Sequence, residues 1–308
     1  MKKIIITFLI YAEISLSLAQ TKKNESMTGT SVEILTQIEQ VSFTGISRIF
    51  WDNKIFTTGN SGKVTCFDTT GNTVWHREIP SQLVTAPLVT DGQVIIGTVN
   101  GEVISLIAHT GEQIQSLGID DTVTTDLTSL NYEGNKELFL PKQSDSKTAL
   151  IFGTSSGTLY CLDLETLQEY WRNNDSRGEI FYTPLVVQNK IIFSGSDGYI
   201  YSIDARSGLL NWRWKETETT DFSKSVIVSD GRRIYAAADD SQLYCLDLLL
   251  GKLVWKTERL KILPAIGLSA DKKRLFAKTD DKRFLIFSAD KGTITKQIKM
   301  DEQFDSSR

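Results

Sequence analysis

The segment GTLYCLDLETLQEYW at residues 157–171 returns as GYIYSIDARSGLLNW at 198–212 and as SQLYCLDLLLGKLVW at 241–255. When the three copies are aligned on their final tryptophans, they are separated by 41 and 43 residues. Three further copies, two of them weaker, occur at 62–75, 101–115 and 282–296. A motif that returns at a nearly constant period predicts a repeat architecture.

Each repeat is divided by turn residues into four short β-rich runs. In residues 182–215, Asn189-Lys190, Asp197-Gly198 and Ser207-Gly208 separate the runs. Four strands per repeat are typical of a β-propeller blade. A helical solenoid is excluded because no stretch shows helical periodicity over a dozen residues, and a β-sandwich would not repeat one motif at one period. The sequence therefore predicts an all-β propeller of six four-stranded blades, at about 43–79, 83–118, 123–172, 181–216, 224–258 and 263–299.

The repeated motif assigns a physical role to each of its residues. An aspartate at the end of the third strand is expected to accept hydrogen bonds from the amides of the next turn. The turn glycine supplies a positive φ, so Leu167, which replaces it in the third repeat, predicts a strained or remodelled turn. The tryptophan begins the outer strand and is expected to be buried between adjacent blades. The residues concerned are Asp68, Asp163, Asp204 and Asp247, and Trp75, Trp171, Trp212 and Trp255.

The three cysteines share one motif position, in the first, third and fifth repeats. Equivalent points on non-adjacent blades should lie farther apart than the roughly 7 Å between Cα atoms that a disulfide allows. We therefore expect Cys66, Cys161 and Cys245 to be small core residues, with no redox or metal-binding role.

The segments CFDTTGNTVW, CLDLLLGKLVW and SIDARSGLLNW resemble the PQQ-like β-propeller repeat, in which the tryptophan of each blade docks onto its neighbour. The resemblance covers residues 43–299, with Gln115 and Lys296 replacing the tryptophan in the second and sixth repeats. Proteins of this class include quinoprotein dehydrogenases, the BamB-type factor of outer-membrane protein assembly and other exported propellers. The resemblance implies the fold and export, but the name of the repeat does not imply the cofactor.

The N-terminus predicts export. Lys2 and Lys3 precede an apolar run at 4–12, with small residues at 17 and 19, as in a secretory signal peptide. The run is too short to span a bilayer. Because the first cysteine, Cys66, lies inside the repeats, no lipid anchor is expected. The predicted organisation is a signal peptide at 1–19, a linker at 20–30, the propeller at 31–300 and a C-terminal tail at 301–308.

A leading segment, SVEILTQIEQV at 31–41, lies one period before the strand that contains Trp75. We expect it to form a strand that pairs with the last blade and helps to close the ring, because pairing protects an otherwise open sheet edge.

No catalytic constellation is found in the sequence. A quinoprotein dehydrogenase of this class would be expected to carry an adjacent cysteine pair, which is absent. His76 and His109 are expected at the surface, and the acidic segments at 238–242 and 279–282 predict turns between second and third strands rather than calcium sites. We therefore expect no metal and no cofactor, PQQ included.

One interval between turn positions is about fifteen residues too long, and the excess falls at 131–148. It contains Leu138, Phe139 and Leu140, which the repeat does not require, so we predict either an extra β-ribbon or a partner-binding loop. The mouth of the central channel is a second candidate site, lined by first strands such as TAPLVT (85–90) and YTPLVV (182–187).

The net charge of −4 and the pI near 5.4 provide no basic field for nucleic acid. We expect a monomeric periplasmic or secreted protein, without a membrane span, that acts as a non-catalytic scaffold for other proteins of the bacterial cell envelope, by resemblance in BamB-like outer-membrane protein assembly. Two alternatives stay open: a quinoprotein-type dehydrogenase or PQQ-binding module, and an extracytoplasmic ligand or carbohydrate sensor.

Overall fold

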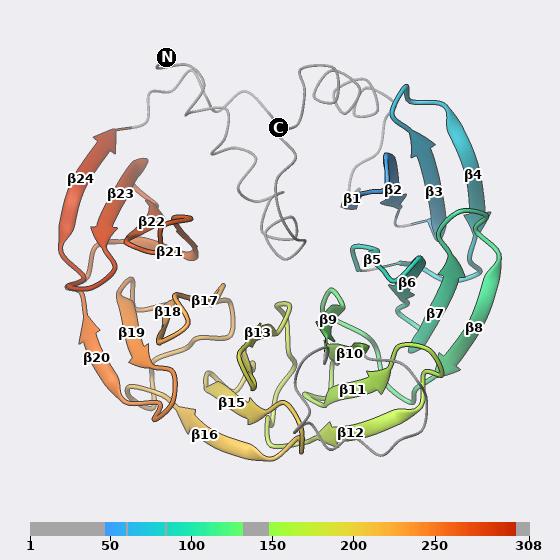
Figure 1. Cartoon of the computed structure of the whole chain (residues 1–308). Coiled ribbons are helices and arrows are strands. Elements are labelled where there is room, and N and C mark those ends of the chain that lie inside the picture. The colour runs from blue at the N-terminus through green and yellow to red at the C-terminus, as the bar shows by residue number, and fades with distance from the viewer. Residues whose placement is uncertain (1–46, 60, 84, 132–147, 300–308) are drawn as a thin grey trace. The chain divides into compact units, whose positions relative to one another are not determined.

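The structure is a computed structural model, and it describes residues 47–59, 61–83, 85–131 and 148–299. These ranges contain 24 β-strands, and no helix that could cross a membrane occurs in them. The strands form six four-stranded antiparallel sheets, each built from four strands that are consecutive in the chain (Figure 1). The predicted all-β propeller class with six four-stranded blades is confirmed. The chain divides into two compact units, 1–127 and 128–308.

The first unit holds two sheets, and the outer strand of each ends within one residue of the predicted end of its repeat. Their strands are β1 (Ser47–Trp51), β2 (Lys54–Thr58), β3 (Lys63–Asp68) and β4 (Thr73–Glu78), then β5 (Leu88–Thr90), β6 (Gln93–Gly97), β7 (Glu102–Ile107) and β8 (Gln113–Gly118).

The second unit holds four sheets, whose outer strands end within two residues of the predicted ends. The third and fourth sheets consist of β9 (Thr128–Asn131), β10 (Thr148–Gly153), β11 (Leu159–Asp163) and β12 (Glu169–Asn173), and of β13 (Leu185–Val187), β14 (Lys190–Ser194), β15 (Ile200–Asp204) and β16 (Leu210–Trp214). The fifth and sixth consist of β17 (Val228–Ser229), β18 (Arg233–Ala237), β19 (Leu243–Asp247) and β20 (Leu253–Lys256), and of β21 (Ile262–Leu268), β22 (Arg274–Thr279), β23 (Arg283–Ser288) and β24 (Ile294–Lys299).

Because all neighbours are antiparallel, each sheet has two distinct ends. We call the end with the turns between first and second and between third and fourth strands the hairpin end, and the opposite end, which leads to the next sheet, the link end. Neighbouring sheets of the second unit keep like ends together. At the hairpin end, Gln188 Nε2 donates a hydrogen bond to Gly231 O at 2.6 Å, and at the link end the Phe222 amide donates to Gly198 O at 3.3 Å.

The middle strands of the fourth and fifth sheets are buried on both faces, as a sheet packed between two others requires, whereas in β22 and β23 of the sixth sheet buried residues alternate with less buried ones. All five residues of β11 are buried. In the core between the third and fourth sheets, Ile151 and Cys161 pack with Phe193 and Tyr201. Comparable clusters lie between the first and second, the fourth and fifth, and the fifth and sixth sheets. The sheet faces therefore form the hydrophobic core.

The cysteine position of the motif lies directly opposite the tryptophan position in the outer strand. Cys66 is paired with Trp75, and Cys161 with Trp171, and a β-bulge follows that position in all six sheets. A small side chain at this point leaves room for the neighbouring indole. The three cysteines are buried and form no disulfide, as predicted.

Each motif tryptophan packs on the turn glycine of the next sheet. A Cβ added to that glycine would lie 2.5–2.6 Å from the indole, so the contact requires glycine. Three of the indoles also donate a hydrogen bond to a carbonyl of the same turn. The pairs are Trp75 with Gly111, Trp171 with Gly208, Trp212 with Gly251 and Trp255 with Gly292. The predicted docking of each tryptophan onto the neighbouring sheet is confirmed.

The motif aspartates cap the turns that follow them. Asp163 Oδ1 accepts hydrogen bonds from the amides of Glu165 and Thr166, at 3.0 and 2.7 Å, and Asp68, Asp204 and Asp247 accept equivalent ones. Leu167 adopts the left-handed conformation that glycine has elsewhere, with φ 54°, and its side chain is buried. The predicted strained turn is therefore present, and burial of the leucine side chain offsets part of its cost.

Candidate functional site

The predicted partner-binding residues Leu138, Phe139 and Leu140 lie outside the described residues, as do the leading segment 31–41 and the signal sequence. The described strands on either side show only where the insertion falls in the order of elements. Strand β9 ends at Asn131 and β10 begins at Thr148, so the insertion separates the first and second strands of the third sheet. Its role in binding stays a prediction.

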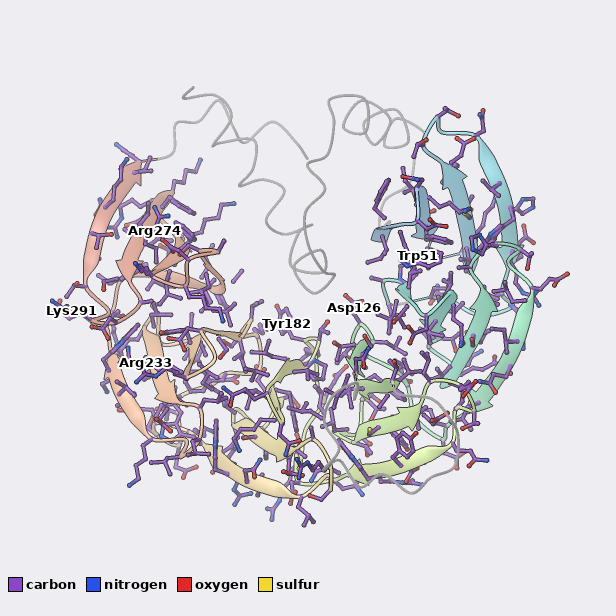
Figure 2. All side chains as sticks on the ribbon, viewed as in Figure 1. Trp51, Asp126, Tyr182, Arg233, Arg274 and Lys291 are labelled. Carbon is purple, nitrogen blue, oxygen red and sulfur yellow. The ribbon has the colours of Figure 1, made fainter. Side chains whose placement is uncertain are left out.

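The second predicted candidate site consists of first strands, and those of the two quoted segments, β5 and β13, have three residues each and are mainly apolar. Strand β13 has only three residues, all partly buried. Tyr182, which precedes it, is exposed at the first-strand edge of its sheet (Figure 2). An exposed aromatic side chain there is a contact surface, but no cluster of charged groups accompanies it.

The histidines and cysteines form no reactive centre in the described part of the chain. His76 and His109 are exposed, and the ring of His109 lies 5.8 Å from that of Trp51. Burial raises the pKa of the Cys66 thiol to about 11 and that of Cys245 to about 12, so both remain protonated at neutral pH. No group of three or more His, Cys, Asp or Glu side chains that could hold a metal ion is found among the described residues.

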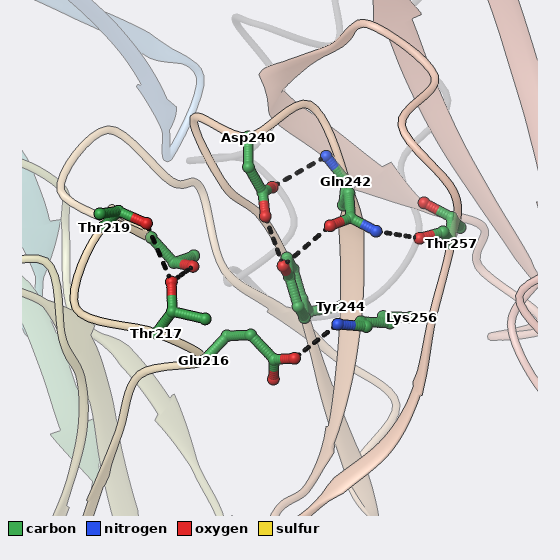
Figure 3. A network of polar contacts seen from close by, with 9 residues as sticks. Glu216, Thr217, Thr219, Asp240, Gln242, Tyr244, Lys256 and Thr257 are labelled. Carbon is green, nitrogen blue, oxygen red and sulfur yellow. Dashed lines mark hydrogen bonds and ion pairs between the residues drawn. The ribbon is translucent and has the colours of Figure 1, made fainter.

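A polar network lies at the link end of the fifth sheet (Figure 3). Asp240 Oδ2 accepts a hydrogen bond from the Tyr244 hydroxyl at 2.5 Å, and the Gln242 side chain donates to Thr257 O. Burial and this carboxylate together raise the pKa of Tyr244. The phenol therefore keeps its proton and cannot act as a general base at neutral pH.

The same tyrosine–aspartate pair occurs in the fourth sheet, where the Tyr201 hydroxyl donates to Asp197. A contact that returns at the same position of successive repeats indicates a structural role. In the fifth sheet, Lys256 adds an ion pair to Glu216, 2.5 Å apart, which fastens the preceding link to the outer strand. This network stabilises the link ends and supplies no nucleophile.

Large apolar side chains are exposed on two adjacent turns at the hairpin end. Leu209 is 68% exposed, Leu249 67% and Leu250 58%, and Leu210 and Leu253 beside them are also exposed. Trp212 joins the two turns, because its indole packs on Gly251 and its Nε1 donates a hydrogen bond to Leu248 O at 3.2 Å. We call these five leucines the leucine surface. Large apolar side chains exposed at the same end of two neighbouring sheets are a candidate protein-interaction site.

The leucines at 249 and 250 are not what this turn requires. The equivalent pairs in the other five sheets are polar or charged: Thr69-Thr70, His109-Thr110, Glu165-Thr166, Arg206-Ser207 and Asp290-Lys291. In three of those turns the hydroxyl of the second residue donates a hydrogen bond to the motif aspartate, at 2.6–3.0 Å. Leu250 forgoes that bond and retains only its amide contact with Asp247, at 2.7 Å. The departure is visible in the sequence only when the six turns are aligned on their turn glycines.

Comparison with known proteins shows which family the chain belongs to. The sequence profile of the family described as outer membrane protein assembly factor BamB matches residues 27–128, 140–227 and 213–302, nearly all of the repeats. The chain belongs to the BamB family. The last matched range contains Leu249, Leu250 and Leu253, and the range before it contains Leu209 and Leu210.

Curated relatives in the BamB family are distant. Outer membrane protein assembly factor BamB of Burkholderia pseudomallei is 26% identical over 246 residues, which are 75% of this chain and 59% of that protein. BamB of Kangiella koreensis is 24% identical over 283 residues, 79% of this chain and 72% of that protein. The chain thus spans less than two thirds of the Burkholderia relative.

Solved structures support the same fold. The crystal structure of BamB from Moraxella catarrhalis matches with a TM-score of 0.61 at 16% identity, covering 80% of this chain and 73% of that one. The computationally designed Ika8 protein matches with a TM-score of 0.52 at 15% identity, covering 83% and 87% of the two chains. At identities this low, the two structural matches show only that this chain shares their fold.

Proposed function

We propose that this protein is an exported, non-catalytic scaffold of the bacterial cell envelope that binds other proteins and takes part in outer-membrane protein assembly. Membership of the BamB family supports this role, as do the signal-like N-terminus and the protonated state of its buried thiols and of Tyr244. The proposal also includes the absence of PQQ and of any other cofactor.

The observation that carries the proposal is the leucine surface. Two leucines replace the polar pair that five other turns use, at the cost of a hydrogen bond to Asp247. In an isolated monomer the exposed leucine side chains contribute no stabilising free energy at this position. Burial against a partner protein would contribute about 25 cal/mol of binding free energy for each Å² of apolar surface removed from water. The occupant we assign is a partner protein of the outer-membrane assembly process.

The test is capture of partners from the envelope fraction of the bacterium that encodes the chain, with the tagged full-length protein as bait. The variant Leu249→Thr/Leu250→Thr removes both leucines. The turn of the third sheet has the same length and carries Thr166 at the position of Leu250, so the fold should tolerate the change. The matched control is Val74→Thr/Ile114→Thr, which removes two 46% exposed apolar residues from other strands.

We expect envelope proteins of outer-membrane assembly to be recovered with the wild-type and control baits and lost with the leucine variant. Equal recovery with all three baits would refute the leucine surface as the binding site. Oxidation of an alcohol or sugar by the purified protein, after addition of PQQ and calcium, would refute the non-catalytic role. A Leu138→Ser/Phe139→Ser/Leu140→Ser variant tests the predicted loop in the same assay.

A further inference from the structure

A pocket of about 290 Å³ opens between the fifth and sixth sheets at their hairpin ends. It lies inside the second unit, and its lining includes four basic side chains and two acidic ones. Arg233, which begins β18, projects beside the sixth sheet, and Arg274 begins the neighbouring β22 (Figure 2). The charged lining residues are Arg232, Arg233, Lys272, Lys273, Asp230 and Asp290.

The carboxylate of Asp230 is fully engaged by its own turn. Its Oδ1 accepts hydrogen bonds from the amides of Arg232 and Arg233, both at 2.7 Å, and its Oδ2 accepts one from the Tyr235 hydroxyl at 2.8 Å. Burial alone would raise the pKa of Asp230, but these hydrogen bonds lower it. Asp230 therefore stays ionised, but its oxygens are occupied by the turn and by Tyr235, and no described basic side chain forms a salt bridge with them.

The basic side chains are only partly neutralised. Arg233 Nη1 is bonded to Asp290 Oδ1 at 2.9 Å, and Lys272 Nζ donates to the backbone carbonyl of Asp230 at 3.0 Å, an acceptor without a charge. The guanidinium of Arg232 and the ammonium of Lys273 are exposed and form no hydrogen bond or ion pair with any described residue. The pocket thus presents unpaired cations around a concave surface.

The pocket borders the leucine surface. The Leu248 amide donates a hydrogen bond to Arg232 O at 3.0 Å, so Leu249 and Leu250 follow directly from the wall of the pocket. A segment whose apolar side chains cover these two leucines would therefore bring its neighbouring residues to Arg232. Apolar and cationic contacts side by side fit a ligand that is both apolar and acidic.

We propose that this pocket binds a carboxylate side chain of an acidic, leucine-rich segment of a partner protein. The proposal rests on the proposed scaffold function and adds the charge of the partner to it. A single carboxylate fits better than a polyanion, because Asp290 in the pocket and Asp271 in the same turn as Lys272 would repel additional negative charge. A carboxylate can accept two hydrogen bonds from one guanidinium, and the guanidinium of Arg232 has both donors available.

The probe is a fluorescein-labelled nonapeptide of three glutamates, three leucines and three glycines, compared with the same peptide carrying glutamine for glutamate. Binding to the full-length protein is measured by fluorescence anisotropy at low and moderate salt. The pocket variant is Arg232→Glu/Lys273→Glu. The control variant, Lys224→Glu/Arg259→Glu, makes the same change of charge on exposed residues at the link ends of the same unit.

We expect the glutamate peptide to bind wild type and control about tenfold or more tightly than the glutamine peptide, with this preference lost in the pocket variant and reduced by salt. Equal affinity for both peptides, or equal losses in both variants, would overturn the proposal. So would pocket-dependent sedimentation with phosphatidylglycerol vesicles in the absence of peptide binding, which would assign the pocket to anionic lipid.

The leucine variant separates this proposal from the scaffold function. If envelope partners are captured through the leucine surface while the pocket variant captures them equally well, the scaffold function stands and the carboxylate site is wrong. If neither variant changes capture, the leucine surface is not the binding site for envelope partners, and the carboxylate site, which rests on that surface, is refuted with it.

Discussion

The indole of Trp212 occupies the space that a side chain at residue 251 would need. A Cβ on Gly251 would lie 2.5 Å from Cδ2 of the indole, and the backbone of Gly251 has φ 66°. Glycine is therefore required twice at this position, for its conformation and for its lack of a side chain. The same two demands meet wherever a motif tryptophan packs on the next sheet.

Gly251→Ala should therefore destabilise the protein more than conformation alone explains. We expect about 1–2 kcal/mol from the left-handed backbone and about 1–3 kcal/mol more from overpacking against Trp212. Gly92→Ala is the matched control, because Gly92 has φ 74° but open space where its Cβ would lie. Chemical denaturation followed by circular dichroism measures both, and equal losses would contradict the steric part.

Trp255 differs from the other motif tryptophans in its hydrogen bonding. Trp171 Nε1 donates to Ala205 O at 3.2 Å, whereas the buried Nε1 of Trp255 has no partner within the described structure. Replacement by phenylalanine removes a satisfied donor at 171 and an unsatisfied one at 255. We expect Trp171→Phe to cost about 1–3 kcal/mol more than Trp255→Phe, measured as a difference in unfolding midpoints. The reverse order would show that ring packing dominates both sites.

Much of the fold was predictable because every repeat states the same physical requirements. Asp163, Gly208 and Trp171 each occupy a motif position whose chemistry demands that residue type, and the structure places each as expected. The strained turn at Leu167 was also predictable, because the motif places a residue with positive φ at this position and leucine rarely adopts that conformation. The β-bulge between Cys161 and Leu162 was not, because register depends on the pairing of strands and leaves no single-residue signature.

The candidate site was less accessible to sequence reasoning. An exposed leucine looks like a core leucine in a pattern of apolar residues, so the run 248–250 does not by itself show that Leu248 is buried and Leu249 and Leu250 are exposed. Only alignment with the polar pairs of the other turns marks the last two as unusual. The pocket around Arg232 was hidden for a different reason. Its walls come from turns about forty residues apart in sequence, and only the packing of two sheets brings them together.

Leu250→Thr should stabilise the fifth sheet. A threonine hydroxyl at this position would donate to Asp247, as Thr166 does to Asp163 at 2.8 Å in a turn of the same length. We expect a gain of about 0.5–1.5 kcal/mol from that hydrogen bond, with little lost because Leu250 is 58% exposed. Leu250→Val provides a branched side chain without the hydroxyl. Thermal unfolding should rank threonine above valine, and the absence of a difference would mean that the turn gains nothing from a capping hydroxyl.

The stability of the first unit should depend on pH through Asp126 (Figure 2). Asp126 Oδ1 accepts a hydrogen bond from the Ala86 amide at 2.6 Å, but burial outweighs that bond and raises the pKa of the carboxyl above its ordinary value of 3.8. Since the folded state then binds the proton more tightly than the unfolded state, stability should increase as pH falls from the folded pKa towards 3.8.

Asp126→Asn removes the charge and keeps an oxygen that can accept the hydrogen bond from the Ala86 amide. It should raise the melting temperature at pH 7.5, and most of the gain should be lost at pH 3.5, where the wild-type carboxyl is protonated in the folded state and largely protonated in the unfolded state. Asp68→Asn is the control of opposite sign. Hydrogen bonds from Thr70 and Asn72 lower the pKa of Asp68 to about 2, so its contribution is present above pH 3.8 and is lost as pH falls through 2. Asp68→Asn should therefore lower the melting temperature at pH 7.5, and shifts of the same sign in both variants would contradict the burial argument for Asp126.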